Sequence, residues 1–294
     1  TQTQRLSFYD EIRKNKIYSV LLIAIVFAIL ILIGYAISMA FDPSYFFFIL
    51  ILSIIISMLY IVVSYYNSDK IAIASVNAKP ANQSQYRQYY HSVEGLCLAS
   101  GLPMPKLYVM ENPQINAFAS GRDPKHAVIC VTTGALEKLN KQELEGVLAH
   151  ELSHIANFDI RFMTLTAVLV GMIAIISEIF LRSLWLKSGG DRDNKASVVF
   201  LIIGIILAIL APIIVQLVQL AISRRREYVA DANAVKFMRT PSGLIGALTK
   251  IKSNSEMKVT GAVAPLFLAK PSRASNLFET HPRLEDRIEK LRRM

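Results

Sequence analysis

The sequence His150-Glu151-Leu152-Ser153-His154 places two histidines four residues apart, with a glutamate beside the first. On an α-helix, side chains four residues apart project from the same face, so both imidazoles can reach one ion. Zinc held by three protein ligands keeps a fourth position for water and lowers the pKa of that water towards about 7. The Glu151 carboxylate, on the adjacent face, can take a proton from that water and pass it to a leaving amine. The stretch therefore predicts one zinc ion per chain, with Glu151 as the catalytic base.

The residues before the histidines predict a compact α+β unit that ends in the helix carrying them. Asn140 and Glu143 have the spacing of a capping box, which predicts that the helix begins there. An earlier helix is expected at Gln85–Ser100 because Gly101 and Pro103 follow it. Strands are expected at Lys106–Met110, Gln114–Ala119 and Ala127–Val131, with a turn at residues 121–124.

A third metal ligand must come from further along the chain. The short-spaced pattern with a third histidine fails, because Asn157 and Ile160 occupy its glycine and histidine positions. We expect Glu227 to be the ligand and Asp231, one helical turn later, to accept the N–H of a ligating histidine and set its tautomer. The alternatives are that these carboxylates form a solvated pair beside three arginines, or that Glu178 is the ligand.

Long apolar runs explain why 53% of the 294 residues are hydrophobic and only 18% are charged. About 20 apolar residues cross the hydrocarbon core of a bilayer. The four candidate spans are Ile17–Phe41, Tyr45–Tyr66, Phe162–Leu181 and Ala196–Ser223. The first run is long for a signal peptide and a second run follows at once, which favours a membrane hairpin over a cleaved leader.

Lys and Arg residues are more frequent on one side of the runs, and this bias orients the protein. On the other side the first loop carries none, and the loop between the third and fourth runs carries four, partly offset by two aspartates. The formal net charge is +10, and clusters such as Arg224–Arg226 stand at the ends of runs. The positive-inside rule then predicts a multi-pass protein of the cell membrane with both termini and the 67–161 region in the cytoplasm. Topology explains these charges, so no nucleic-acid partner is expected. Cys97 and Cys130 lack the spacing of a disulfide framework or a cysteine zinc site.

Four regions follow along the chain. They are an N-terminal transmembrane hairpin (1–66), a cytoplasmic zinc-protease domain (67–161), a second transmembrane hairpin (162–223) and a C-terminal part of the catalytic domain (224–294). The last region contains two helical patterns joined by a stretch at 253–276. The two crossings between His154 and Glu227 return the chain to the same side of the membrane, as a shared ion requires.

Several motifs, in this order along the chain, resemble the HtpX family of membrane zinc endopeptidases, which are related to the CAAX prenyl endopeptidases. Besides the two N-terminal spans, the matching segments are Asn116–Ala119, Thr133–Leu136, His150–His154, Arg226–Asp231 and Thr280–Pro282. The resemblance implies a gluzincin-like catalytic domain fused to about four transmembrane helices, mainly α overall with a small sheet. It also implies zinc, and a role in degrading misfolded or damaged membrane proteins under stress.

The resemblance assigns roles to residues that carry little signal alone. Asn116, Ala117, Phe118 and Ala119 would form an edge strand beside the zinc cleft, to which a substrate adds as an antiparallel strand. His281 would stabilise the oxyanion near the scissile carbonyl, with Arg287 in support. Without the resemblance, these residues read as an ordinary sheet strand and as a surface histidine before a proline.

Two rival functions remain open at this point. One is a CAAX-type endopeptidase acting on prenylated peptides, although four spans are few for the chamber of that group. The other is a membrane scaffold with a structural zinc, which would need four protein ligands and no base at Glu151. Protein or peptide substrates and the lipid bilayer are the expected partners, whereas the natural substrates and the oligomeric state are not readable.

Overall fold

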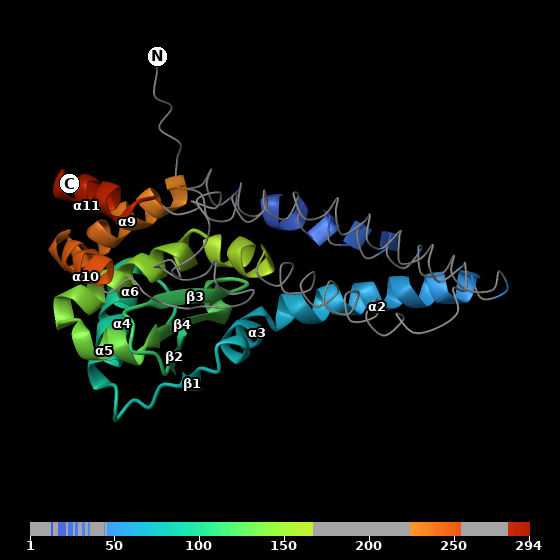
Figure 1. Cartoon of the computed structure of the whole chain (residues 1–294), viewed down its shortest axis with the longest axis horizontal. Coiled ribbons are helices and arrows are strands. Elements are labelled where there is room, and N and C mark those ends of the chain that lie inside the picture. Colours follow the sequence, from blue (N-terminus) through green and yellow to red (C-terminus); the bar gives the residue numbers. More distant parts are fainter. Residues whose placement is uncertain are drawn as a thin grey trace, which may run out of the picture.

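The computed structural model of the chain describes residues 46–166, 224–253 and 282–294, together with residue 44 and scattered residues between 13 and 35. Helices dominate this part of the chain, and one small mixed sheet accompanies them (Figure 1). In chain order the elements are α2 (Phe46–Tyr66), α3 (Ser68–Ser75), β1 (Lys79–Pro80), α4 (Arg87–Ser100), β2 (Lys106–Met110), β3 (Ala117–Gly121), η2 (Pro124–His126), β4 (Ala127–Thr132), α5 (Thr133–Lys138), α6 (Lys141–Ala156), α9 (Arg224–Met238), α10 (Ser242–Ser253) and α11 (Leu284–Arg292). The mainly helical fold with a small sheet is as predicted.

α2 coincides with the second predicted span. With 21 residues it is the one helix, among the described residues, that is long and apolar enough to cross a membrane. Phe47, Ile56 and Met58 are exposed on it, and Figure 1 shows the helix projecting away from the sheet. Exposed apolar surface of this extent is typical of a helix that contacts lipid or another protein segment.

The other three predicted spans fall wholly or largely outside the described residues. Scattered helical residues are described within Ile17–Phe41, and residues 162–166 are described at the start of Phe162–Leu181. Ala196–Ser223 and the rival ligand Glu178 are outside the described ranges altogether. The arrangement with four spans therefore stays a prediction.

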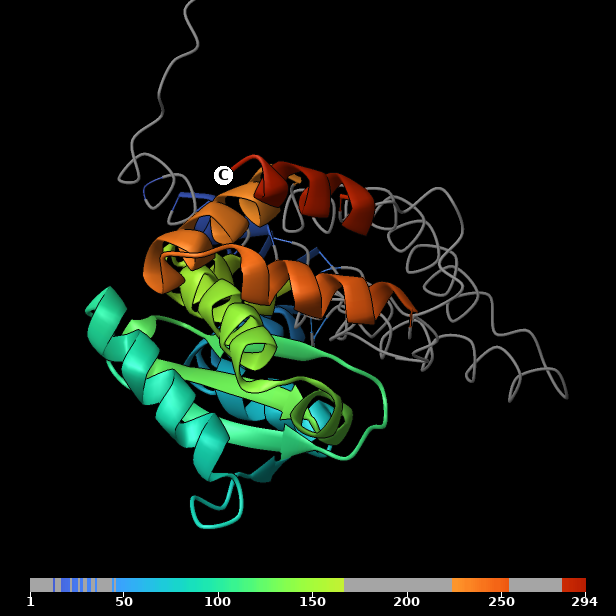
Figure 2. The same ribbon diagram turned by 90° about the vertical axis from the view of Figure 1, so that its left-hand side faces the viewer.

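The sheet has the strand order β1-β2-β4-β3, so β3 is one of its two outer strands. β4 pairs in parallel with β2 and antiparallel with β3, while β1 pairs antiparallel with β2. Every residue of β4 is buried, as expected for an inner strand covered on both faces. α6 lies over one face of the sheet, and α3 packs against the other face (Figures 1 and 2).

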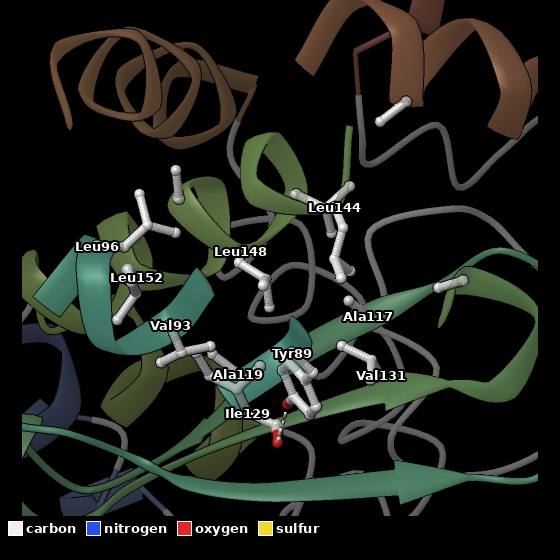
Figure 3. Close-up of a cluster of buried hydrophobic side chains, with 14 of the residues drawn as sticks. Tyr89, Val93, Leu96, Ala117, Ala119, Ile129, Val131, Leu144, Leu148 and Leu152 are labelled. Carbon is white, nitrogen blue, oxygen red and sulfur yellow. Dashed lines mark hydrogen bonds between the residues drawn. The ribbon is translucent and has the colours of Figure 1, made fainter. Parts of the chain in front are cut away.

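Side chains alternate between the two faces of the sheet because successive residues of a strand point in opposite directions. Ile129 and Val131 join Tyr89 of α4 and Leu148 of α6 in the larger core (Figure 3). The Tyr89 hydroxyl donates a hydrogen bond of 3.0 Å to the Ile129 carbonyl, which satisfies the phenol inside that core (Figure 3). Cys130 belongs to the smaller core on the other face. Both cysteines are free thiols, as predicted.

The strand predicted at Gln114–Ala119 is wrong at its start. β3 begins at Ala117, and only the residues from 117 onward share a regular ladder with β4. Before it, the Asn116 N–H donates to the Thr132 side-chain hydroxyl, at 3.0 Å. That hydroxyl also accepts from Ala135 N–H, at 3.1 Å, as the N-cap of α5. A side chain therefore stands in for the strand partner at this point, which explains why the ladder starts later.

Three helices, rather than the two predicted helical patterns, occupy the described part of 224–294. The first pattern divides into α9 and α10 after Met238. Arg239 has a left-handed backbone with φ of +57°, and Pro241 follows it. A proline cannot donate a backbone hydrogen bond inside a helix, so α9 ends and a new helix begins.

α6 is enclosed between the sheet and the C-terminal helices α9 and α10 (Figure 2). α6 and α10 approach each other through glycines. A Cβ on Gly146 would lie 2.5 Å from the Leu244 backbone nitrogen, and one on Gly243 would lie 2.1 Å from the Gln142 carbonyl oxygen. This close approach holds the helix carrying the histidines in a fixed position between the sheet and α10.

Candidate metal centre

α6 begins at the predicted capping box. The Asn140 side chain accepts from the Glu143 N–H at 2.9 Å, and the Glu143 carboxylate accepts from the Asn140 N–H at 2.8 Å. Lys250 of α10 also pairs with Glu143, at 2.7 Å. Two backbone donors that have no partner inside a helix are thereby satisfied. The start of the helix is well defined, and this sets which face carries the histidines.

The two histidines of α6 and one glutamate of α9 converge in the protein interior. His150, His154 and Glu227 are all buried, and one potential ligand atom of each lies within 4.8 Å of the others. The two Nε2 atoms are 3.2 Å apart. The Glu227 carboxylate oxygens lie 3.5 Å from His150 Nε2 and 3.6 Å from His154 Nε2. The residues predicted as ligands are thus brought together although Glu227 lies 73 positions after His154 in the chain (227 − 154).

A carboxylate holds the other nitrogen of each histidine ring. Asp231 Oδ1 lies 3.0 Å from His150 Nδ1, and Asp159 Oδ2 lies 3.0 Å from His154 Nδ1. A carboxylate accepts hydrogen bonds, so each Nδ1 carries a proton, and each Nε2 would present a lone pair to a metal once the second proton of His150 has been displaced. Two lone pairs and a carboxylate facing one point are a donor set that suits zinc.

Charge at the site also favours a cation. Burial and the neighbouring Arg287 both lower the pKa of His150. Hydrogen bonds to Asp231 and Glu227 outweigh these effects and raise the pKa to about 9. The carboxylates therefore stabilise positive charge on His150, and a bound metal ion supplies positive charge in place of that proton.

Arg287 of α11 is fully buried against the carboxylates of α9. Its guanidinium donates from Nε and from a terminal nitrogen to Asp231, at 2.9 and 2.6 Å. The other terminal nitrogen lies 3.1 Å from a Glu227 oxygen. Burial raises the pKa of the Asp231 carboxyl, but Arg287 and His150 lower it by more than burial raises it, so that the net shift is downward. The observed partners of Arg287 are thus metal-site carboxylates, while its predicted support of an oxyanion stays a prediction.

Glu151 lies beside the ligands and next to β3. Burial raises the pKa of its carboxyl above the ordinary value, against the opposing effects of His150 and His154. The backbone amide of Ala119 lowers it by a hydrogen bond. A carboxyl whose pKa is raised above its ordinary value is a better match for taking a proton from water and releasing it again.

The predicted substrate strand lies at the edge of the described sheet. The Thr132 N–H donates to the Asn116 carbonyl at 3.1 Å, and Ala117 and Ala119 pair with Val131 and Ile129. Because hydrogen-bonded pairs alternate along an antiparallel ladder, Ala117 and Ala119 direct their backbone groups away from β4. The Ala117 N–H is held by the Asn116 side chain at 3.0 Å. Asn116 itself immediately precedes β3, and His281 lies outside the described residues.

Asp159 was missed by the sequence analysis. It follows Phe158, whose backbone is left-handed with φ of +58°. No residue in Asn157-Phe158-Asp159 is a glycine, so the usual sequence signal for that conformation is absent. The one available hint is an acidic residue five positions after a ligating histidine.

Comparison with known proteins places the chain in a family. The model of peptidase family M48 matches residues 82–294, which include all the ligands described above. The chain belongs to peptidase family M48. It is therefore a metalloprotease, and the predicted relationship to the HtpX proteases is confirmed.

Several curated relatives of this M48 peptidase carry the name protease HtpX homolog. The protein from Thermoanaerobacter pseudethanolicus is 48% identical over 250 residues, covering 83% of this chain and 84% of the relative. The protein from Caldanaerobacter subterraneus is 44% identical over 294 residues, covering 96% and 95%. The one from Streptococcus uberis is 38% identical, covering 97% and 99%.

A solved structure shares the fold. The crystal structure of S. mikatae Ste24p aligns with a TM-score of 0.51 and 20% sequence identity. The alignment covers 95% of this chain and 65% of that structure. The likeness supports the arrangement of helices and sheet described here.

Proposed function

We propose that this metalloprotease is a zinc endopeptidase of the cell membrane, held by several membrane spans, that cleaves misfolded or damaged membrane proteins on the cytoplasmic side. The convergence of His150, His154 and Glu227, with Glu151 beside them, carries the proposal. Three ligands among the described residues leave a coordination position for water, as in catalytic rather than structural zinc sites. The exposed apolar surface of α2 supports the membrane location.

In this proposal, His150, His154 and Glu227 hold the zinc, and Asp231 orients the ring of His150 through Nδ1. When bound, zinc supplies a Lewis acid that acidifies water and polarises the peptide carbonyl. Glu151 takes the proton from the attacking water and donates it to the leaving amine. His281 and Arg287 are proposed to support the oxyanion.

The substrate is proposed to add to β3 as a further strand. Ala117 and Ala119 direct backbone groups away from β4. Their N–H groups already bond the Asn116 side chain and the base Glu151, so a substrate strand would pair there through their carbonyls. A strand paired there would place its backbone beside Glu151 and the ligands. Pairing through backbone groups does not depend on side chains, so it suits substrates of many sequences.

The test compares the unaltered protein with Glu151→Gln in detergent, using an unfolded soluble protein as substrate. We expect about one zinc per chain in both proteins, and cleavage by the unaltered protein alone. We expect a chelator to stop that cleavage and added zinc to restore it. Cleavage by the Glu151→Gln variant at the unaltered rate would contradict the assignment of the base.

A further inference from the structure

Asp159 occupies a position that links the two halves of the metal centre. Its side chain is 2% exposed. One carboxylate oxygen lies 3.0 Å from His154 Nδ1, and the other lies 3.7 Å from Nε of Arg226 on α9. Arg226 directly precedes the ligand Glu227. The same carboxylate thus faces a ligand on α6 and the neighbour of a ligand on α9.

The backbone before Asp159 is arranged to bring it there. α6 ends at Ala156 with Asn157 as its C-cap, and Phe158 takes a left-handed backbone with φ of +58°. That conformation costs a residue with a side chain about 1 kcal/mol or more. It turns the chain so that the next helical segment, residues 159–166, starts with Asp159 against His154.

The Arg226 side chain extends the link to the start of that segment. Arg226 is 8% exposed, and its guanidinium lies 4.9 Å from the centre of the Phe162 ring. Phe162 begins the third predicted span, while Arg226 follows the fourth. Arg226 therefore lies between the residue that begins the third predicted span and the carboxylate that contacts a metal ligand.

The other ligating histidine, His150, also has a carboxylate partner at Nδ1, which suggests that the two carboxylates have the same role. Asp231 contacts His150 Nδ1 at 3.0 Å and is itself bound by Arg287 at 2.6 Å. Asp159 and Arg226 repeat this order of groups at His154, with a longer separation between carboxylate and guanidinium. In both pairs the carboxylate lies between a ring nitrogen and a guanidinium, and hydrogen bonds to a carboxylate are shorter and stronger than those between neutral groups.

We propose that Asp159 is a positioning residue of the metal centre: it holds His154 with Nε2 facing the metal and, through Arg226, ties α9 to the end of α6. The proposal rests on the zinc site proposed above. It adds a residue that lies outside His150–His154, Arg226–Asp231 and the predicted ligand set, and it assigns a role to the left-handed turn at Phe158.

The test measures zinc affinity of the full-length protein in detergent, by competition with a chromophoric chelator, for the unaltered protein and Asp159→Asn. Removing a carboxylate partner of a ligating histidine weakens metal binding by about 10- to 100-fold. Asp159→Glu, which keeps the carboxylate, should recover part of that loss. Asp123→Asn is the matched control, because Asp123 accepts from His126 Nδ1 at 2.8 Å in an exposed pair away from the ligands.

Cobalt bound in place of zinc serves as a spectroscopic probe of how Asp159 affects the metal centre. The visible absorption of bound cobalt should change in Asp159→Asn and remain unchanged in Asp123→Asn. Zinc affinity of Asp159→Asn within twofold of the unaltered protein, together with an unchanged cobalt spectrum, would overturn the proposal. If the unaltered protein bound no zinc, the proposed function itself would fail, which is a separate result.

A second measurement uses only the unaltered protein, so it does not depend on whether a variant folds. In the zinc-loaded unaltered protein labelled with ¹⁵N-histidine, NMR should find His154 protonated at Nδ1 and bound to zinc through Nε2. Zinc bound through Nδ1 would sink the proposal, since Asp159 contacts that atom.

Discussion

At the scale of single residues, the metal centre is a set of buried charges that offset one another. Glu227, Asp231 and Glu151 lie within a region from which water is largely excluded. Arg287 is the cation that contacts the first two, at 3.1 and 2.6 Å. A buried ion pair contributes little relative to apolar residues, but removing one partner leaves an uncompensated charge. The stability of the metal-free protein should therefore depend on this arginine.

Arg287→Ala should destabilise the metal-free protein by about 3–5 kcal/mol, because Asp231 loses its bidentate partner. The stability of Arg287→Lys should lie between those of the unaltered protein and Arg287→Ala, since lysine keeps the charge but lacks the planar fork of the guanidinium. The measurement is thermal unfolding in detergent with zinc removed.

Arg293→Ala is the control for that measurement. Arg293 lies at the C-cap of the same helix and pairs with Glu289 on the exposed surface. Exposed pairs of this kind contribute little. If Arg287→Ala and Arg293→Ala unfolded at the same temperature, the proposed role of Arg287 in stabilising the buried carboxylates would be contradicted.

The sequence predicts the motif residues and Asp231 as a partner of a ligating histidine, but not the other residues that contact the centre. His150, Glu151 and His154 form a motif of fixed spacing, and Glu227 could be inferred because a third ligand was required. Asp159 depends on a left-handed phenylalanine, which no local pattern signals. The contacts of Arg287 depend on how α11 packs against α9, a contact between distant segments.

At the scale of elements, α6 is held by its neighbours on both sides. Leu148 and Leu152 lie in the core with the sheet (Figure 3). On the other side, Gly146 meets the backbone of α10. The capping box at Asn140 and Glu143 sets its first turn. Displacement of this helix would move both histidines together relative to Glu227.

Gly146→Ala should destabilise the protein by about 1–3 kcal/mol, as expected for overpacking at a close contact. The new Cβ would meet the backbone of α10, 2.5 Å from the Leu244 nitrogen and 2.7 Å from the Gly243 carbonyl carbon, so α10 would have to shift. The unfolding temperature measures the loss of stability, and the zinc affinity measures whether displacement of the helices disturbs the metal centre.

Gly95→Ala is the matched control for the glycine contact. Gly95 lies within α4, and a Cβ there would meet nothing within 4 Å. Alanine favours a helix over glycine by about 0.5–1 kcal/mol, so this variant should be slightly stabilised. Stabilisation of both variants would show that the α6–α10 contact is less close than described.

Element types were predictable wherever periodicity and caps agreed, as at Gln85–Ser100 and after Asn140. The residues at which elements begin and end were harder to predict. β3 starts later than predicted because the Thr132 hydroxyl takes the place of a strand partner for Asn116. The division of the tail into α9 and α10 was signalled by Pro241 but overlooked, since the apolar pattern continues across it.

At the scale of the described molecule, the apolar helix α2 leads into a body formed by the sheet, α6 and the C-terminal helices (Figures 1 and 2). His150, His154 and Glu227 are buried inside that body. Arg122, in the β3–β4 connection, donates to the carbonyl of Tyr66 at the end of α2, at 2.9 Å. The catalytic body is thus attached directly to the end of the predicted span. Composition predicted the membrane character, whereas this attachment required the structure.

X-ray absorption at the zinc edge of the purified Glu151→Gln protein tests whether the three predicted ligands hold the metal. We predict about one zinc per chain, with two histidine nitrogens at about 2.0–2.1 Å and only oxygen completing the site. Sulfur at about 2.3 Å would implicate Cys97 or Cys130. That result, or the absence of bound zinc, would contradict the metal centre described here.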